Sequence, residues 1–336
     1  MTSAPLPDAG SNWVDRHAPE PLKPWLKLGR FDRPIGIWLL LLPGWQGIAL
    51  AWAQGVNQTN WLGGVIQLLL AFAIGACLMR AAGCAFNDIA DRDIDVKVAR
   101  TAMRPVASGR IKVKQAWAFV IACSLISLMI LLTMNWTTVM LGIVSLALVA
   151  AYPFMKRITW WPQAWLGLTF NWGTLMGYAA VTSFFGWDGM IFAWMNPDVI
   201  GFHADWGNPG FLTLPAILLY LGGVFWTLGY DTIYALQDIE DDAMVGVKSS
   251  ARRLGANVRT GVGLFYLQAV GFASAAGVMA GLGPLFWLGL AAYGGHLALQ
   301  TVRLRRDDPA LALKLFKSNR DAGVILLAAI VMGGLS

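Results

Sequence analysis

The sequence predicts an all-α integral membrane protein, a bundle of nine transmembrane helices. Of its 336 residues, 57% are apolar and only 13% are charged, which lies outside the usual range of soluble domains. Apolar runs recur along the whole chain, and each is about as long as the roughly 20 residues that a helix needs to cross a bilayer. We expect nine such spans, over residues 34–54, 62–84, 116–134, 136–154, 163–185, 213–235, 262–281, 283–302 and 322–336.

The distribution of basic residues predicts the orientation of the bundle. All 25 Lys and Arg residues precede the first span, lie near the inner end of a span, or fall in alternate loops, and such residues in short loops stay on the cytoplasmic side. Residues 186–211 carry three Asp but no Lys or Arg, as expected of an external loop. We therefore expect residues 1–33 to be a cytoplasmic segment and residues 34–336 to form one transmembrane domain, embedded in a lipid bilayer.

The composition also argues against several kinds of site. Cys77, Cys84 and Cys123 lie in or beside predicted spans at spacings that match neither a disulfide framework nor a zinc site, so we expect small core residues there. The three His residues do not cluster in the chain. No basic stretch is interleaved with aromatic residues as a nucleic-acid surface requires. We therefore attribute the net charge of +6 to basic residues that orient the protein in the membrane and to residues that bind an anion.

Two acidic stretches, residues 87–95 and 231–242, interrupt the pattern at the face where basic residues are expected. If the helices continue through them, three oxygen-bearing side chains of each stretch share one face: Asn87, Asp91 and Asp95, and Asp231, Asp238 and Asp242. Stacked carboxylates repel one another, and a cation removes that penalty. Mg²⁺ prefers hard oxygen ligands and is usually held by one or two carboxylates together with substrate phosphates. The pair of stretches therefore predicts a magnesium site, although either stretch alone is also compatible with a solvated loop.

Cationic side chains accompany both stretches. Arg80 lies inside an apolar span, where an Arg is costly and normally marks function, and it shares a helical face with Asn87. It can pair with the carboxylates, contact a diphosphate or extend to the interface. Charge alone leaves open whether Lys156 and Arg157 bind an anion or only mark topology, and the same holds for Arg30.

Carboxylates with Mg²⁺ and nearby cations form a clamp for a diphosphate at the mouth of an apolar bundle. The implied ligand is an amphiphile with a diphosphate head and an apolar tail. Metal ions and cations neutralise charge that develops on a leaving diphosphate, so the expected chemistry is ionisation of an allylic C–O bond. A dry cavity then protects the carbocation from water, and the residues alone leave the acceptor open.

These motifs resemble those of the UbiA-type prenyltransferases, along nearly the full chain from Leu28 onward. The family pattern NDxxDxxxD with RTxxRP is present at residues 87–95 and 100–105, and YDxxYAxxDxxxD with GxKS is present at residues 230–242 and 246–249. The pattern RxD[KR]PIG begins at Arg30, and YPxxKR begins at Tyr152. One departure is the stretch Asn171 to Thr174, where relatives often have Gly-Trp-x-Pro, so Asn171 is expected to bond either the acceptor or a neighbouring helix.

The resemblance implies a fold and a set of functional residues. Nine helices would surround a central cavity that both Asp-rich motifs cap at the cytoplasmic side. Mg²⁺ would be held by Asn87, Asp88, Asp91, Asp95, Asp238 and Asp242. The substrates would contact Arg30, Arg80, Lys97, Arg100, Arg104, Tyr152, Lys156, Arg157, Asn171 and Tyr234. Asp91, Asp231 and Asp238 would be catalytic, with Asp231 placed near the carbocation or removing the ring proton.

Within the family, these details are most similar to the members that act on 4-hydroxybenzoate. The expected reaction is Mg²⁺-dependent transfer of a polyprenyl group from its diphosphate to the ring carbon ortho to the hydroxyl group, in ubiquinone biosynthesis in a bacterial inner membrane. A naphthoate, homogentisate or haem acceptor is the first alternative. A transporter of an anionic amphiphile is the second, although transporters usually place such groups near the midplane of repeated halves.

Overall fold

Helices occupy all nine of the predicted ranges. The computed structural model describes residues 12–55, 61–96, 101–182, 212–237, 239 and 246–336, and these contain no strand. The long helices are α3 (Ile35–Ala53), α4 (Trp61–Asp95), α5 (Val113–Leu131), α6 (Trp136–Ile158), α7 (Pro162–Thr182), α9 (Leu214–Tyr234), α12 (Val258–Met279), α13 (Pro284–Arg303) and α15 (Asn319–Gly334). The short ones are α1 (Trp13–His17), α2 (Lys23–Leu28), η2 (Ala235–Gln237), α11 (Ser250–Leu254), η3 (Gly255–Asn257) and α14 (Pro309–Lys317).

The apolar helices confirm an all-helical membrane protein. Within the described residues, six stretches are long and apolar enough to cross a membrane: α3, α4, α5, α6, α9 with η2, and α11 with α12. The helices α7, α13 and α15 fall outside that group, and α15 has only 16 residues. Each of the nine predicted spans is therefore helical, but only six stretches are long and apolar enough to cross a membrane, so the count of nine crossings is not confirmed.

Six helices form one closely packed bundle, in which α3, α7, α9, α12, α13 and α15 each pack against the next and α15 returns to α3. Small residues allow the closest approach. A methyl group on Gly47 of α3 would lie 2.1 Å from the carbonyl oxygen of Thr174, and one on Gly177 of α7 would lie 2.1 Å from that of Gly44. Backbones can come this near only where no side chain intervenes, as in many membrane helix pairs.

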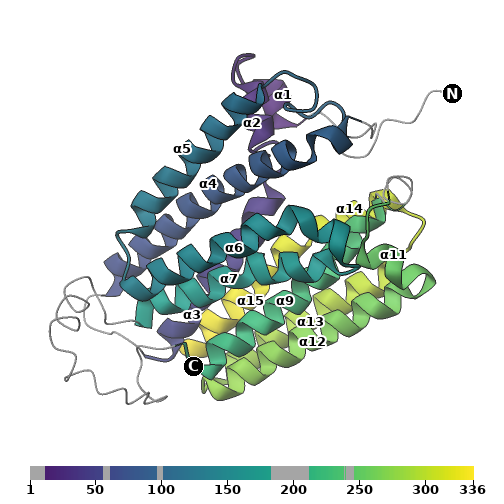
Figure 1. The fold of residues 1–336 in the computed structure, drawn as a ribbon. Coiled ribbons are helices and arrows are strands. Elements are labelled where there is room, and N and C mark those ends of the chain that lie inside the picture. Colours follow the sequence, from purple (N-terminus) through teal and green to yellow (C-terminus); the bar gives the residue numbers. More distant parts are fainter. Residues whose placement is uncertain (1–11, 56–60, 97–100, 183–211, 238, 240–245) are drawn as a thin grey trace.

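The pair α4 and α5 leans away from this bundle (Figure 1). The end of α5 meets the start of α6 near their short connection, where a methyl group on Gly142 would lie 2.6 Å from Leu131. From there the two helices diverge. A cavity of about 1370 Å³ lies between α4 and α5 on one side and α3, α6, α7 and α9 on the other. The splayed hairpin therefore provides one wall of a large internal space.

A buried polar network fixes the junction between α14 and α15. The Trp226 indole donates to Asn319 at 2.9 Å, and the Asn319 amide donates to Gln300 at 3.1 Å. Tyr266 donates to the same Gln300 oxygen at 2.8 Å. These residues come from α9, α12, α13 and α15, so the network ties four helices together, and the Gln300 Nε2 is its one buried polar atom without a hydrogen-bond partner among the described residues.

Candidate active site

The carboxylates of the first acidic stretch lie on the last turns of α4, at the mouth of the cavity. As predicted, α4 continues helically through Asn87, Asp91 and Asp95. Asp88, Asp91 and Asp95 all line the cavity, and each is at most 5% exposed. A buried carboxylate requires hydrogen bonds or an opposite charge, so the partners of these three residues define the site.

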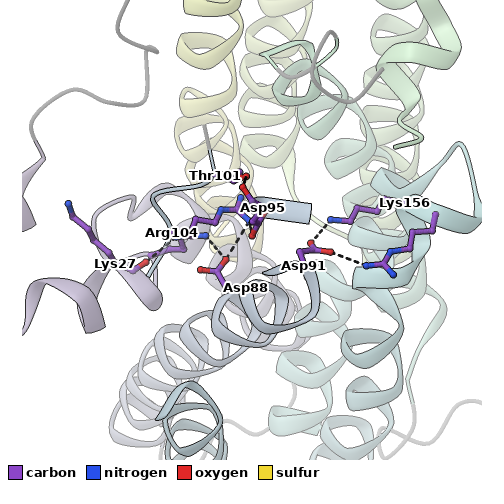
Figure 2. A network of polar contacts seen from close by, with 9 residues as sticks. Lys27, Asp88, Asp91, Asp95, Thr101, Arg104 and Lys156 are labelled. Atoms are coloured by element: carbon purple, nitrogen blue, oxygen red, sulfur yellow. Dashed lines mark hydrogen bonds and ion pairs between the residues drawn. The ribbon is translucent and has the colours of Figure 1, made fainter. Parts of the chain in front are cut away.

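Two arginines pair with Asp88 and Asp95 (Figure 2). Arg30 Nη2 donates to Asp88 Oδ1 at 2.7 Å, and Arg104 Nη1 donates to Asp95 Oδ2 at 2.8 Å. Arg104 also lies 3.5 Å from Asp88 Oδ1, so it bridges the two carboxylates. The Thr101 hydroxyl donates to the Asp95 carbonyl at 2.9 Å, which ties the following loop to the end of α4.

Asp91 reaches in the other direction, across the mouth to α6 (Figure 2). It forms an ion pair with Lys156, and Arg157 Nη2 lies 3.4 Å from Asp91 Oδ1. Of the two cations, Lys156 lines the cavity, whereas the Arg157 side chain is 46% exposed and lies over the Phe154 ring. The ion pair therefore joins the end of α4 to the end of α6 beside the cavity.

Arg30 occupies a backbone conformation that favours glycine. It has φ of +57° and follows α2, whose end is closed by hydrogen bonds from Arg30 N to Lys27 O and from Phe31 N to Leu26 O. This is the Schellman arrangement, in which Gly is the usual left-handed residue. An arginine there carries a backbone strain of about 1–2 kcal/mol. The chain accepts this strain at a position whose side chain reaches a buried carboxylate.

Oxygen atoms at this mouth fit a hard cation. Asn87 Oδ1 and Asp88 Oδ2 are buried and have no hydrogen-bond partner in the described part of the chain. Within the same residues no three His, Cys, Asp or Glu side chains converge on one point. Asp238 and Asp242, which were predicted to complete the metal site, lie outside the described residues. The first motif thus offers amide and carboxylate oxygens of the kind that Mg²⁺ prefers, as one part of a site.

Arg80 lies within the cavity wall rather than in the carboxylate network. Its guanidinium stands over the Phe170 ring at 5.6 Å, and its Nε is buried without a hydrogen-bond partner among the described residues. Tyr152, Tyr234 and Asp231 line the same cavity. The structure therefore brings these four predicted residues together behind the α4 carboxylates.

The GxKS element closes the side of the mouth next to α6. Lys248 donates from its backbone N–H to Lys156 O and from Nζ to Ile158 O, both at 3.0 Å. Ser250, which starts α11, hydrogen-bonds Thr232 of α9 at 2.6 Å. Lys248 also lines the cavity. The loop therefore connects the ends of α6 and α9.

Asn171 corrects one prediction of substrate binding. Its side chain is fully buried and donates to Thr227 of α9 at 2.7 Å and to Gly167 O at 2.9 Å. It is absent from the cavity wall, although its neighbours Phe170 and Trp172 contribute to it. The alternative expectation, a hydrogen bond to a neighbouring helix, is the one that the structure shows. The Asn171 amide nitrogen is therefore satisfied within the bundle, by α9 and by its own helix, whereas its buried Oδ1 has no hydrogen-bond partner among the described residues.

Four predicted residues lie outside the described part of the chain, and several cations of the cavity wall were missed, namely Arg33, Lys248, Lys314, Lys317 and Arg320. Lys97 and Arg100 fall outside the described residues, as do Asp238 and Asp242. Lys314 and Lys317 line the cavity mouth, but sequence reasoning counted them only as topology-determining charges. Their three-residue spacing within a short amphipathic segment was the available signal.

Comparisons with known proteins identify the family. Residues 40–323 match the UbiA prenyltransferase family. The chain is 42% identical over 322 residues to the mitochondrial 4-hydroxybenzoate polyprenyltransferase of Bos taurus, covering 96% of this chain and 78% of the relative. It is 41% identical to the Arabidopsis thaliana protein of that name, covering 96% and 72%.

Solved structures share the fold. An apo UbiA homologue from Aeropyrum pernix K1 is 25% identical, with a TM-score of 0.63, covering 88% of this chain and 96% of that one. A homologue from Archaeoglobus fulgidus, bound to GPP and Mg²⁺, is 16% identical with a TM-score of 0.58, covering 92% and 99%. The chain therefore belongs to the UbiA prenyltransferase family.

Proposed function

We propose that this prenyltransferase transfers a polyprenyl group from polyprenyl diphosphate to 4-hydroxybenzoate, at the ring carbon ortho to the hydroxyl group, for ubiquinone biosynthesis. Its relatives at about 41% identity carry the name of that activity. The observation that carries the proposal is the set of buried carboxylates Asp88, Asp91 and Asp95, each paired with a cation, at the mouth of a cavity of about 1370 Å³.

Divalent metal dependence is the first part of the proposal. A homologue of the same fold binds GPP together with Mg²⁺. Here Asn87, Asp88, Asp91 and Asp95 would hold Mg²⁺, with Asp238 and Asp242 completing the site. When bound, Mg²⁺ neutralises the charge that develops on the leaving diphosphate. The unpartnered Asn87 and Asp88 oxygens support this assignment.

The cations of the carboxylate network would hold the diphosphate. Arg30, Arg104 and Lys156 form ion pairs with these carboxylates. Binding of a divalent cation to the same oxygens would free these side chains to donate to phosphate oxygens, where guanidinium groups make bidentate contacts. Arg157 would join them from the rim, and Lys97 and Arg100 are proposed to do so from the adjoining loop.

Arg80 is our candidate to hold the carboxylate of the aromatic acid. It is the cation deepest in the predicted span, and among the described residues it forms no ion pair. A benzoate bound to its guanidinium would lie beside Phe170 and in reach of the wall formed by Tyr152, Tyr234 and Asp231. Asp231 is the proposed base for the ring proton.

The reaction would be an electrophilic aromatic substitution. The allylic C–O bond breaks as diphosphate leaves, and the ring carbon ortho to the phenol oxygen attacks the carbocation. The apolar wall excludes water that would quench the cation, and aromatic faces such as Phe170 stabilise positive charge. The prenyl tail would extend between α5 and α6, past lining residues such as Leu128 and Leu146.

We further propose that the mouth of the cavity faces the cytoplasm, or the corresponding side of an organelle membrane on which Lys and Arg residues are retained. The charge distribution supports this orientation, since most Lys and Arg residues lie in the loops at the end of the bundle where the mouth is. A bacterial inner membrane was expected from the resemblance, but the named relatives are mitochondrial, so they give that location no support.

An assay with purified protein in detergent tests the proposal. Radiolabelled polyprenyl diphosphate is incubated with Mg²⁺ and a panel of aromatic acceptors, and lipid-soluble product is measured with and without EDTA. We expect Mg²⁺-dependent labelling of 4-hydroxybenzoate alone. Product with a different acceptor would overturn the substrate, and tight diphosphate binding without any product would favour the transporter.

A further inference from the structure

The helix α14, which packs on α9, contributes its polar face to the same cavity that the α4 carboxylates line. Its apolar face, Ala312, Leu313, Leu315 and Phe316, is buried. The Asp308 side chain caps it by accepting from Leu311 N at 2.9 Å. An N-cap of this kind stabilises a helix by about 1 kcal/mol, so a nine-residue segment is held in helical form.

Aromatic contacts fix α14 to the helix that carries Asp231. The ring of Phe316 lies 4.6 Å from that of Tyr234 and 5.9 Å from that of Tyr230. Directly after α14, Asn319 enters the buried network with Trp226. Aromatic pairs and satisfied buried amides both resist displacement. The backbone of α14, from which its exposed side chains extend, therefore keeps a defined position relative to the active site.

Two of those exposed side chains are lysines. Lys314 and Lys317 line the cavity and are three residues apart, so their Cβ atoms lie about 5–6 Å from each other on one helix face. Neither side chain takes part in an ion pair or hydrogen bond among the protein's described residues. By contrast, Arg104 and Lys156 are engaged with carboxylates. Within the described residues, the lysine pair is thus positive charge that no carboxylate neutralises.

We propose that Lys314 and Lys317 form a binding station for the diphosphate group at the aqueous rim of the active site. This inference rests on the proposed function and adds a contact on the α9 side of the mouth. Ammonium groups bind phosphate as point charges, and two of them favour a multiply charged diphosphate over the single charge of an aromatic carboxylate. The station captures the head group of the donor before it reaches the α4 carboxylates, and it receives the diphosphate that leaves.

The test compares two double charge reversals in the segment between α13 and α15. Lys314→Glu with Lys317→Glu removes the station, and Arg305→Glu with Arg306→Glu is the matched control, because these exposed arginines make the same charge change outside the cavity wall. We expect the lysine variant to raise KM for the donor by about tenfold or more and to weaken its dependence on salt, while kcat and KM for the aromatic acid change less than about twofold. The control should resemble wild type.

Binding of inorganic diphosphate with Mg²⁺, measured by calorimetry without an acceptor, separates the station from the reaction. Weaker binding in the lysine variant supports the station even if no acceptor is ever prenylated. Equal effects in both double variants would mean that only the net charge of the protein matters, and this would overturn the inference. A change confined to the aromatic acid would assign the lysines to the acceptor and also overturn it. Lys314→Gln with Lys317→Gln, checked for its melting temperature, guards against misfolding, and we expect it to show a smaller loss in the same direction.

Discussion

Arg30 combines a strained backbone conformation with a side chain that contributes to the site. Its left-handed conformation suits glycine, yet its side chain pairs with the buried Asp88. We expect both Arg30→Ala and Arg30→Gly to lower the free energy of unfolding, because each leaves Asp88 with less compensation. Arg30→Ala should be less stable than Arg30→Gly by about 1 kcal/mol, since only glycine relieves the strain. Thermal unfolding in detergent checks the order, and equal melting temperatures would contradict it.

Asp91 is the residue on which the proposed metal site depends most. Asp91→Asn should reduce turnover by about a hundredfold or more, as expected when a group that supports charge neutralisation in the transition state is lost. The fold should persist, because Lys156 is about one-quarter exposed and can be hydrated once its partner is neutral. Steady-state rates and the melting temperature are the measurements.

The same stretch offers a control for that variant. Asp93 belongs to the same acidic run, but its side chain is 88% exposed and is absent from the cavity wall. Asp93→Asn should therefore keep wild-type turnover. Normal activity in Asp91→Asn, or an equal loss in Asp93→Asn, would contradict a site built on the buried face of α4.

At the scale of elements, the contact between α3 and α7 decides how tightly the bundle closes. A methyl group on Gly177 would lie 2.1 Å from a backbone carbonyl oxygen of α3, which cannot move aside as a flexible side chain can. Gly177→Ala should therefore lower stability by about 1–3 kcal/mol. Gly271→Ala on the exposed face of α12, where nothing lies within 4 Å, should be neutral or slightly stabilising. Thermal unfolding of both variants tests this, and similar melting temperatures would count against the close contact.

At the scale of the whole molecule, the charge distribution predicts on which side of the membrane each loop lies. A cysteine at Arg306, in the basic loop before α14, should react with a membrane-impermeant maleimide only from the positive-inside face. A cysteine at Thr133, exposed between α5 and α6, should react only from the other face. Labelling of sealed vesicles in both orientations, in a background without the three native cysteines, is the measurement. Labelling of both positions from one face would refute the topology.

Periodicity and composition were enough to predict the helices and the shared acidic face of α4. The nine apolar runs became helices because helix formation depends on local residues and on the length of the apolar stretch. The sharing of one face by Asn87, Asp91 and Asp95 follows from the 3.6-residue repeat, which needs no knowledge of the rest of the chain. The functional roles that the family motifs imply for these residues stay predictions.

Contacts between distant segments were decided only by the tertiary structure. Asp91 pairs with Lys156, 65 residues away, because α4 and α6 meet at the mouth. The Asn171 side chain hydrogen-bonds Thr227 and does not line the cavity. Lys314 and Lys317 line the cavity because Phe316, on the same helix, packs on α9. By itself, then, the sequence determined which residues are helical, which face of α4 is acidic and where the charges concentrate. Which cation meets which carboxylate depends on helix packing, since a side chain's partner is set by the approach of whole helices and not by its own neighbours in the chain.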